Sequence, residues 1–226
     1  MAEMEDAAAA KAAAKKATLQ HLSTGELSCS GEEVGAEPSS EGASFEPILI
    51  ADVESESIVD GPGFRFSVYT QGCPHHCPEC HNPQTHTFEG GVAVTPVQLL
   101  KLAQKSPLHK GITLTGGEPL CQAKALIPFA RLAREAGYNI WIYSGYLYEQ
   151  VFSLELPGTE HPPSSLGAQT KVPSCAQELL DLCDVLVEGP FLIEQRSLDL
   201  KWKGSKNQRV IDLNATRQAG EIVLFA

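Results

Sequence analysis

Three cysteines lie close together within residues 71–82, at Cys73, Cys77 and Cys80, and the next cysteine is Cys121. Prolines at positions 74 and 78 each remove a backbone donor and fix φ, so a regular helix cannot run through this stretch. A loop with this spacing can wrap around a compact inorganic core. Iron–sulfur clusters are normally held by four cysteine thiolates. Three thiolates can hold three irons of a [4Fe–4S] cluster and leave the fourth iron open to a substrate, so the spacing indicates chemistry rather than a structural staple.

Two other uses of these cysteines compete with a cluster. A zinc ion would need a fourth ligand, which His75, His76, His81 or His86 could supply, and the chain would then be a zinc-stabilised binding module without catalysis. Disulfides are disfavoured, because the chain has seven cysteines and shows no signal peptide. The spacing alone therefore favours a cluster and leaves a zinc site open.

The cysteine spacing resembles that of the radical S-adenosylmethionine (SAM) enzymes. The Asp-Gly-Pro-Gly stretch at 60–63 and the Cys-His-Asn at 80–82 narrow the resemblance to the activases of glycyl-radical enzymes. The Gly-Gly-Glu-Pro turn at 116–119 and the Trp-Lys-Gly-Ser-Lys-Asn-Gln stretch at 202–208 agree with it. Over about residues 48–212 the chain resembles the activating proteins of the anaerobic (class III) ribonucleoside-triphosphate reductase.

The resemblance implies an enzyme with two cofactors, a [4Fe–4S] cluster and SAM. Cys73, Cys77 and Cys80 would hold the cluster as its catalytic ligands. Reduced by an outside electron donor such as a flavodoxin, the cluster would cleave SAM to methionine and a 5′-deoxyadenosyl radical. That radical would take a hydrogen from a backbone glycine of the reductase, the implied partner. An activase of another glycyl-radical enzyme, of the pyruvate formate-lyase type, and a radical SAM enzyme acting on a small molecule stay open as alternatives.

The residues expected to bind SAM follow two other strands. Gly116 and Gly117 permit a tight turn and a close backbone approach to a ligand, and Glu118 can receive a ligand ammonium. In the family this turn binds the methionyl amine of SAM. Ser144 is a candidate partner of the SAM carboxylate or ribose, although a serine that satisfies its own turn fits nearly as well.

One position departs from the family pattern. Many superfamily members carry an aromatic residue just before the third cysteine, where it packs near the adenine, and this chain has Glu79 there. We therefore expect the adenine contact from elsewhere and assign it to His81. Glu188, at the end of a predicted strand, is expected to form a polar wall of the site. The resemblance suggests that the turn at 60–63 lies near the incoming glycyl loop of the partner.

Strand and helix patterns alternate from residue 47 onward. Strands are expected at 64–69, as a half-buried strand, and at 111–115, 139–143 and 184–187, with weaker strand patterns at 208–212 and 221–225. Helices are expected at 97–104 after a Thr-Pro start, at 123–136 before a glycine, at 146–154 and at 176–183.

This alternation implies an α/β fold with a mostly parallel sheet. In β/α barrels, functional residues gather at the carboxyl ends of the strands. The cysteine loop, the Gly-Gly-Glu-Pro turn and Ser144 all follow predicted strands, and this points to one shared site independently of the resemblance. Because the core is too short for eight βα units, we expect an incomplete (β/α) barrel of about five to six parallel strands, of the radical SAM type.

Composition separates an extension from a single core. Residues 1–45 are of low complexity, first rich in Ala and Lys and then in Ser, Gly and Glu, and are expected to be disordered. Residues 46–226 are expected to form the activase domain, with a Pro/Ser/Gly-rich surface insertion at 157–173. A net charge of −11 disfavours a nucleic-acid surface, and no apolar stretch has the length of a membrane span. We therefore expect a cytoplasmic protein.

Overall fold

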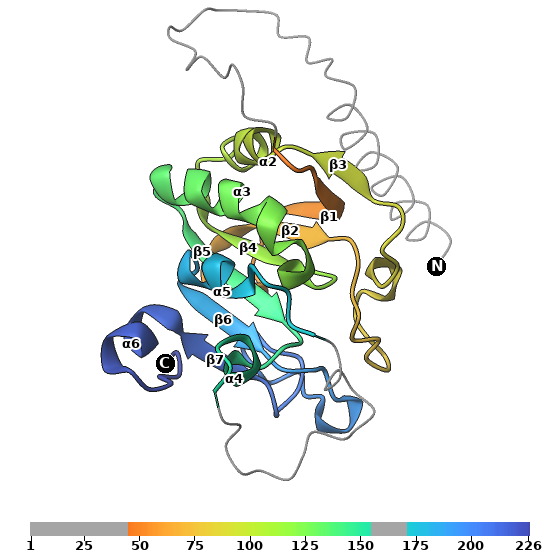
Figure 1. The fold of residues 1–226 in the computed structure, drawn as a ribbon, viewed down its shortest axis with the longest axis vertical. Coiled ribbons are helices and arrows are strands. Elements are labelled where there is room, and N and C mark those ends of the chain that lie inside the picture. The colour runs from red at the N-terminus through yellow and green to blue at the C-terminus, as the bar shows by residue number, and fades with distance from the viewer. Residues whose placement is uncertain (1–44, 155–170) are drawn as a thin grey trace, which may run out of the picture.

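One sheet of seven strands organises the part of the chain that the computed structural model describes, residues 45–154 and 171–226 (Figure 1). The strands are β1 (Ile48–Ser57), β2 (Phe64–Thr70), β3 (Val92–Val94), β4 (His109–Gly116), β5 (Asn139–Ser144), β6 (Val185–Glu188) and β7 (Arg209–Asp212). Their order in the sheet is β3-β1-β2-β4-β5-β6-β7. The expected extension, except for its last residue, and most of the expected insertion lie outside the described residues.

The centre of the sheet is parallel and its sides are antiparallel. β2, β4, β5 and β6 run parallel to one another, whereas β1 and β3 on one side and β7 on the other pair antiparallel. The expected α/β class with a parallel sheet is confirmed, but its parallel part has four strands rather than five or six. Between β6 and β7 lies only the three-residue turn η3 (Ile193–Gln195), so no crossover helix carries the chain back for another parallel strand.

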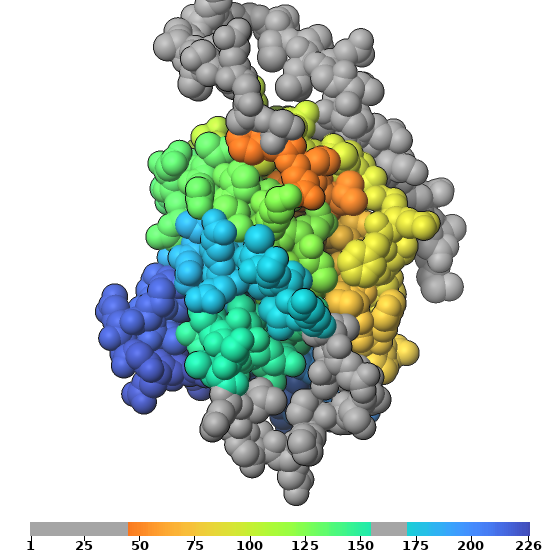
Figure 2. Space-filling view, viewed as in Figure 1, coloured from red at the N-terminus to blue at the C-terminus, as the bar shows by residue number. Residues whose placement is uncertain are grey.

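Three of the helices cover one face of this sheet (Figure 1). The helices are α2 (Pro96–Ala103), α3 (Ala123–Glu135), α4 (Tyr148–Val151), α5 (Ala176–Asp181) and α6 (Leu213–Ala219), and two further short turns are η1 (Pro83–Thr85) and η2 (Pro119–Gln122). The three on this face are α2, α3 and α5. Helix α3 packs against both α2 and α5 (Figure 1), and Figure 2 shows residues of α3 and α5 side by side on one face of the molecule. No helix among the described residues combines the length and the apolar character needed to cross a membrane.

Every second residue of the parallel strands points toward these helices. The register places Phe66 beside Ile112 and Val68 beside Leu114, and it continues from Leu114 to Ile142 in the next strand. These side chains are fully buried and belong to the main core. Because burying one such side chain contributes about 1.5–3 kcal/mol, this row is a main source of stability for the sheet and the helices on it.

The opposite face of the sheet is also covered, which corrects the expectation that the strand at 64–69, now β2, is half-buried. Arg65 in β2 is fully buried and donates hydrogen bonds to the Thr113 hydroxyl and the Ile112 carbonyl. Its guanidinium lies 5.4 Å from the centroid of the Trp141 ring. Phe225 and Trp202 pack edge-on against Trp141 and close this face. A charged residue in an alternating pattern therefore marks a polar interior here rather than a solvent face.

Most of the predicted elements are confirmed within two residues, and two are wrong. The helix expected at 146–154 is only the four-residue α4, which stops just before Ser153 in a left-handed conformation with φ 54°. The strand expected at 221–225 is a single bridge between Ile211 and Leu224. β1, β3 and α6 were not predicted. The second half of β1 is polar and partly exposed, so it lacks an apolar pattern.

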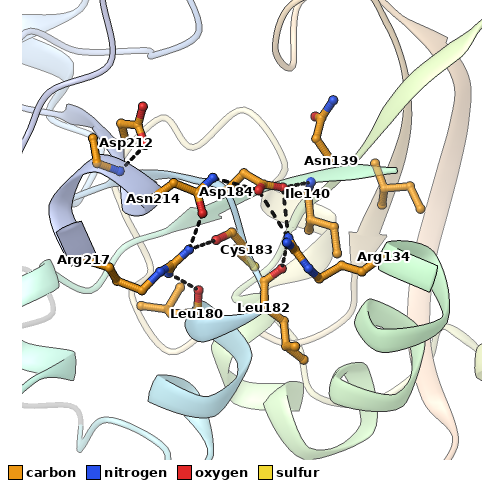
Figure 3. Close-up of polar contacts among 12 residues, drawn as sticks. Arg134, Asn139, Ile140, Leu180, Leu182, Cys183, Asp184, Asp212, Asn214 and Arg217 are labelled. Carbon is orange, nitrogen blue, oxygen red and sulfur yellow. Dashed lines mark hydrogen bonds and ion pairs between the residues drawn. The ribbon is translucent and has the colours of Figure 1, made fainter. Parts of the chain in front are cut away.

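Asp184, directly before β6, ties the amino ends of two strands to the helices (Figure 3). Its carboxylate accepts hydrogen bonds from the Ile140 N–H (2.7 Å), from Asn214 Nδ2 (2.9 Å) and from Arg134 Nη1 (3.2 Å). Arg217 of α6 donates to the Cys183 carbonyl (3.1 Å) in the same region. These contacts lie at the edge of the sheet opposite to the cysteine loop, so they stabilise the fold rather than contribute to the site.

Candidate active site

A cavity of about 320 Å³ lies at the carboxyl ends of β2, β4 and β5. The cysteine loop follows β2, the Gly-Gly turn closes β4, and Ser144 is the last residue of β5. The wall of the cavity includes most of the predicted site residues, namely Cys73, Cys77, Cys80, His81, Gly116, Gly117 and Ser144. The structure thus brings together, at one end of the sheet, the segments that follow three neighbouring parallel strands.

One of the three cysteine sulfurs in this wall accepts a backbone hydrogen bond, from the Asn82 N–H to Cys80 at 3.4 Å. The main chain at His75 and at Phe191 acts to lower the pKa of the Cys73 and Cys77 thiols, against the larger effect of burial. All three cysteines are free of disulfides. Hydrogen bonds to the sulfurs are a feature of protein-bound iron–sulfur clusters, where they tune the reduction potential. The donor set therefore fits a cluster held by three thiolates.

The cavity does not favour bare thiolates. Burial raises the pKa of the Cys73 thiol to about 12, against a lowering effect of the His75 main chain, and the nearby Glu118 and Cys77 raise the pKa further. Burial also raises the pKa of Cys77. A bound metal deprotonates a coordinating thiol and compensates its charge, so three thiolates in this place require a cationic partner. Among residues 45–154 and 171–226, no group of three or more His, Cys, Asp or Glu side chains is arranged to hold a single metal ion.

The two glycines of the turn after β4 are required by close packing. Gly116 has φ 93°, and a Cβ at this position would lie 2.5 Å from the Cα of Tyr69. A Cβ at Gly117 would lie 2.4 Å from the Gly72 carbonyl oxygen, at the start of the cysteine loop. The Gly117 N–H donates to the Thr70 carbonyl at 2.9 Å. The turn therefore holds the ends of β2 and β4 together while its backbone lines the cavity.

Glu118 lies behind the wall rather than in it. Its side chain is fully buried and is not among the residues that line the cavity. Oε2 accepts hydrogen bonds from the Gly145 N–H (2.8 Å) and Ser144 Oγ (3.1 Å) and lies 2.8 Å from His75 Nε2, while Oε1 accepts from the Leu120 N–H (3.0 Å). Both oxygens are thus engaged within the protein, and these contacts do not support the expected role as acceptor of a ligand ammonium.

Ser144 combines the two readings that the sequence left open. It lines the cavity, yet its hydroxyl donates to Glu118 and accepts a hydrogen bond from the Tyr146 N–H at 3.0 Å. A serine whose hydroxyl satisfies its own turn has these contacts. Ser144 therefore lies where it could face a ligand in the cavity, but its hydroxyl already has two hydrogen-bond partners within the protein.

His81 stands at the junction of two cavities. It lines the cavity described above and a second one of about 270 Å³, and both cavities also share Asp60, Tyr143 and Gly204. Its ring lies 4.9 Å from that of Phe191, which also lines the first cavity. Phe191 was missed by the sequence reasoning, although an aromatic residue after the Gly-Pro that follows β6 was visible as a signal.

Two further predictions concern charged residues near this end of the sheet. Glu188 does not line the cavity, so the expected polar wall is wrong; it is buried and accepts a hydrogen bond from Arg209 Nε at 2.6 Å. Asp60 does line the cavity, and its Oδ2 accepts hydrogen bonds from Ser57 Oγ (2.6 Å) and Ser67 Oγ (2.8 Å). The hydroxyl of Tyr143, another wall residue, is buried without a hydrogen-bond partner within the described ranges.

Comparison with known proteins agrees with this geometry. Residues 59–211 match the model of the family described as 4Fe-4S single cluster domain. The anaerobic ribonucleoside-triphosphate reductase-activating protein of Haemophilus influenzae is 30% identical over 159 residues, which are 67% of this chain and 89% of that protein. The pyruvate formate-lyase-activating enzyme of Clostridium pasteurianum is 41% identical over 105 residues, 44% of each chain. The crystal structure of QueE from Escherichia coli covers 61% of this chain and 68% of its own, with 18% identity and a TM-score of 0.40.

Proposed function

We infer that this chain, which belongs to the 4Fe-4S single cluster domain family, is a radical SAM activase that generates the glycyl radical of an anaerobic ribonucleoside-triphosphate reductase. One observation carries the proposal. Cys73, Cys77 and Cys80 line a single cavity at the carboxyl ends of the parallel strands, and the Cys80 sulfur accepts a hydrogen bond from the Asn82 N–H. The match to the Haemophilus influenzae relative, over 89% of that protein, supports the choice of reductase.

We assign the three cysteines as ligands of a [4Fe–4S] cluster. When bound, the cluster supplies the electron that cleaves SAM to methionine and a 5′-deoxyadenosyl radical, and the protein supplies binding and orientation. The backbone N–H of Asn82 holds the Cys80 sulfur in place. The turn at Gly116 and Gly117 presents bare main chain to the cavity, which suits contact with the amine and carboxylate of SAM.

The other proposed SAM contacts follow from the wall of the cavity. Ser144 faces the ligand from the end of β5, and Glu118 acts from behind by fixing Ser144 and the main chain after it. His81 and Phe191 offer two neighbouring ring faces, which suit the flat adenine base. Glu79, the residue before the third cysteine, does not line the cavity, which agrees with the absence of an aromatic residue at this position.

The second cavity suits the segment of the partner that carries the reacting glycine. It adjoins the first through Asp60, His81 and Tyr143, so a backbone that enters it comes next to the SAM site. Val59 and Leu198 at its rim are 69% and 88% exposed. Large apolar side chains exposed in this way are typical of surfaces that another protein covers.

Three finer points complete the proposal. The sheet is an incomplete (β/α) barrel of the radical SAM type, which is supported by helices α2, α3 and α5 lying on one face only. Residues 46–226 form the activase domain, and the protein works in the cytoplasm, where thiols stay reduced. The electron comes from a small redox protein such as a flavodoxin.

One observation favours a second candidate function. The chain is 41% identical to the pyruvate formate-lyase-activating enzyme of Clostridium pasteurianum, although over only 44% of that enzyme. An activase of a different glycyl-radical enzyme would share the cluster, SAM and the cavity and would differ only in its partner.

The proposal is tested by anaerobic reconstitution with iron and sulfide, followed by reduction, addition of SAM and electron paramagnetic resonance. The expected result is a glycyl-radical doublet with the anaerobic reductase and none with pyruvate formate-lyase. A doublet only with pyruvate formate-lyase would establish the second candidate. Cys73→Ala, Cys77→Ala and Cys80→Ala should each abolish SAM cleavage, whereas Cys183→Ala, a buried cysteine of α5's neighbourhood, should retain it; cleavage by any of the first three would contradict the ligand assignment.

A further inference from the structure

The side chain of His75 lies in the protein interior although it belongs to the cysteine loop. Its side chain is 3% exposed, and Nε2 lies 2.8 Å from Oε2 of Glu118, which is fully buried. Because this oxygen also accepts from the Gly145 N–H, it acts as an acceptor, and His75 Nε2 donates. The residue therefore joins the loop between Cys73 and Cys77 to the turn after β4.

The His75 ring fills a place that the surrounding chain reserves for it. It packs edge-on against Tyr146, with ring centroids 4.6 Å apart and an interplanar angle of 72°. A Cβ at Gly145 would lie 2.4 Å from the ring carbon Cδ2, so a side chain at this position would displace the ring. The end of β5 is thus shaped around a residue of the cysteine loop.

Glu118 connects this ring to the rest of the site. Its carboxylate receives donors from the end of β5, at Ser144 and Gly145, and from η2, at Leu120. A buried carboxylate is tolerated only when its oxygens are hydrogen-bonded. Loss of the His75 donor would therefore weaken a junction that three segments share rather than a single contact.

We propose that His75 is a positioning residue, which uses its bond to Glu118 to hold the cysteine loop in the conformation that presents Cys73 to the cavity. His75 is two residues from Cys73 in the same loop, and Cys73 is only 8% exposed. A loop released from Glu118 would expose the thiol. The inference rests on the proposed function only in taking Cys73 as a cluster ligand.

Two variants separate the hydrogen bond from the packing. His75→Phe keeps a ring of similar shape and removes the donor, whereas His75→Gln keeps a donor and removes the ring. His76→Asn is the matched control, because His76 is the exposed neighbour in the same loop and its left-handed φ of 47° suits asparagine. The first measurement uses the protein without cluster: alkylation by iodoacetamide, with the rate at each cysteine read by mass spectrometry. Cys183, which is fully buried, reports global unfolding in the same sample.

We expect Cys73 in His75→Phe to be alkylated on the order of tenfold faster than in the parent, because a hydrogen bond to a charged group is lost. His75→Gln should lie close to the parent, and His76→Asn should equal it. Equal rates at Cys73 in the parent and His75→Phe would overturn the proposal. If Cys183 reacts faster as well, the phenylalanine variant has lost its fold, and the decision passes to Gly145→Ala, whose methyl group would displace the His75 ring from Glu118. The same acceleration at Cys73 is expected in this variant, and its absence overturns the proposal.

A second measurement uses the reconstituted protein. In His75→Phe we expect a higher KM for SAM with a smaller change in kcat, and an altered spectrum of the reduced cluster in the presence of SAM. A residue that served stability alone would leave both unchanged in the folded variant, and that result would overturn the positioning role. If the parent itself yields no glycyl radical, the proposed function fails, but the alkylation result still decides the role of His75.

Discussion

The turn after β4 can be probed by a pair of glycines that share a backbone conformation and differ in their surroundings. Gly116 has φ 93°, and a Cβ there would lie 2.5 Å from the Tyr69 Cα and 2.7 Å from the Thr70 nitrogen. Gly137, after α3, has φ 85°, and a Cβ there would have nothing within 4 Å. Replacing each with alanine therefore separates the cost of the conformation from the cost of the clash.

The expected losses of stability follow from this difference. A left-handed conformation costs an ordinary residue about 1–2 kcal/mol, and both variants carry this cost. In Gly116→Ala the methyl group also meets main-chain atoms of β2, which cannot rotate away, and overpacking adds about 1–3 kcal/mol. We therefore expect a decrease in the free energy of unfolding of about 1–2 kcal/mol for Gly137→Ala and about 2–5 kcal/mol for Gly116→Ala.

Anaerobic urea unfolding of the protein without cluster, followed by circular dichroism, measures both values. SAM cleavage after reconstitution should be lost in Gly116→Ala, because the ends of β2 and β4 must separate, and kept in Gly137→Ala. Equal losses of stability in the two variants would refute the reasoning, since conformation alone would then explain the requirement for glycine.

Three further predictions concern residues away from the cysteines. Asp184→Asn should lower the free energy of unfolding by about 1–3 kcal/mol, measured by urea unfolding, because an amide NH2 in place of one oxygen leaves the donors of Arg134 and Asn214 without this acceptor. Loss of SAM cleavage by the folded variant would contradict its purely structural role. Burial raises the pKa of Glu149 but hydrogen bonds from Arg209 outweigh it, so the pKa is lowered and the stabilisation is lost as the pH falls through the folded-state pKa. The stability gap between the parent and Glu149→Gln should therefore shrink below about pH 4, and a gap independent of pH would contradict this. Tyr143→Phe should change stability by less than about 0.5 kcal/mol, because within the described ranges the buried hydroxyl has no hydrogen-bond partner, while glycyl-radical yield on the partner falls; an unchanged yield would exclude a role in the site.

The sequence predicted best those elements whose ends are marked by capping residues, prolines or glycines. Helix α2 begins after the N-cap residue Thr95, as the Thr-Pro start indicated. The Thr95 hydroxyl accepts a hydrogen bond from the Gln98 N–H, and the Gln98 side chain accepts one from the Thr95 N–H. Helix α6 has comparable signals that were not used, an Asp212 cap and Gly220 at its end. β1 could not be found in this way, because its second half is polar and partly exposed and shows no apolar period.

The candidate site was predictable as a place and less so as a set of contacts. Strand order alone explains why the cysteine loop, the Gly-Gly turn and Ser144 meet, since parallel neighbours end at the same edge of a sheet. The direction of the Glu118 side chain depends on donors from His75 and Gly145, which are 43 and 27 residues away. A short motif says which residues stand side by side in the chain, and it does not say which of them turn inward.

The three cysteines of the loop differ in solvent exposure, because Cys73 is buried while Cys77 and Cys80 are partly exposed. In the proposed activase, we therefore expect an electron donor to approach the cluster from the side of Cys77 and Cys80. Reduction of the cluster then requires only an encounter between the donor and this protein. Its rate should rise in proportion to the donor concentration and should not level off at the speed of an internal motion.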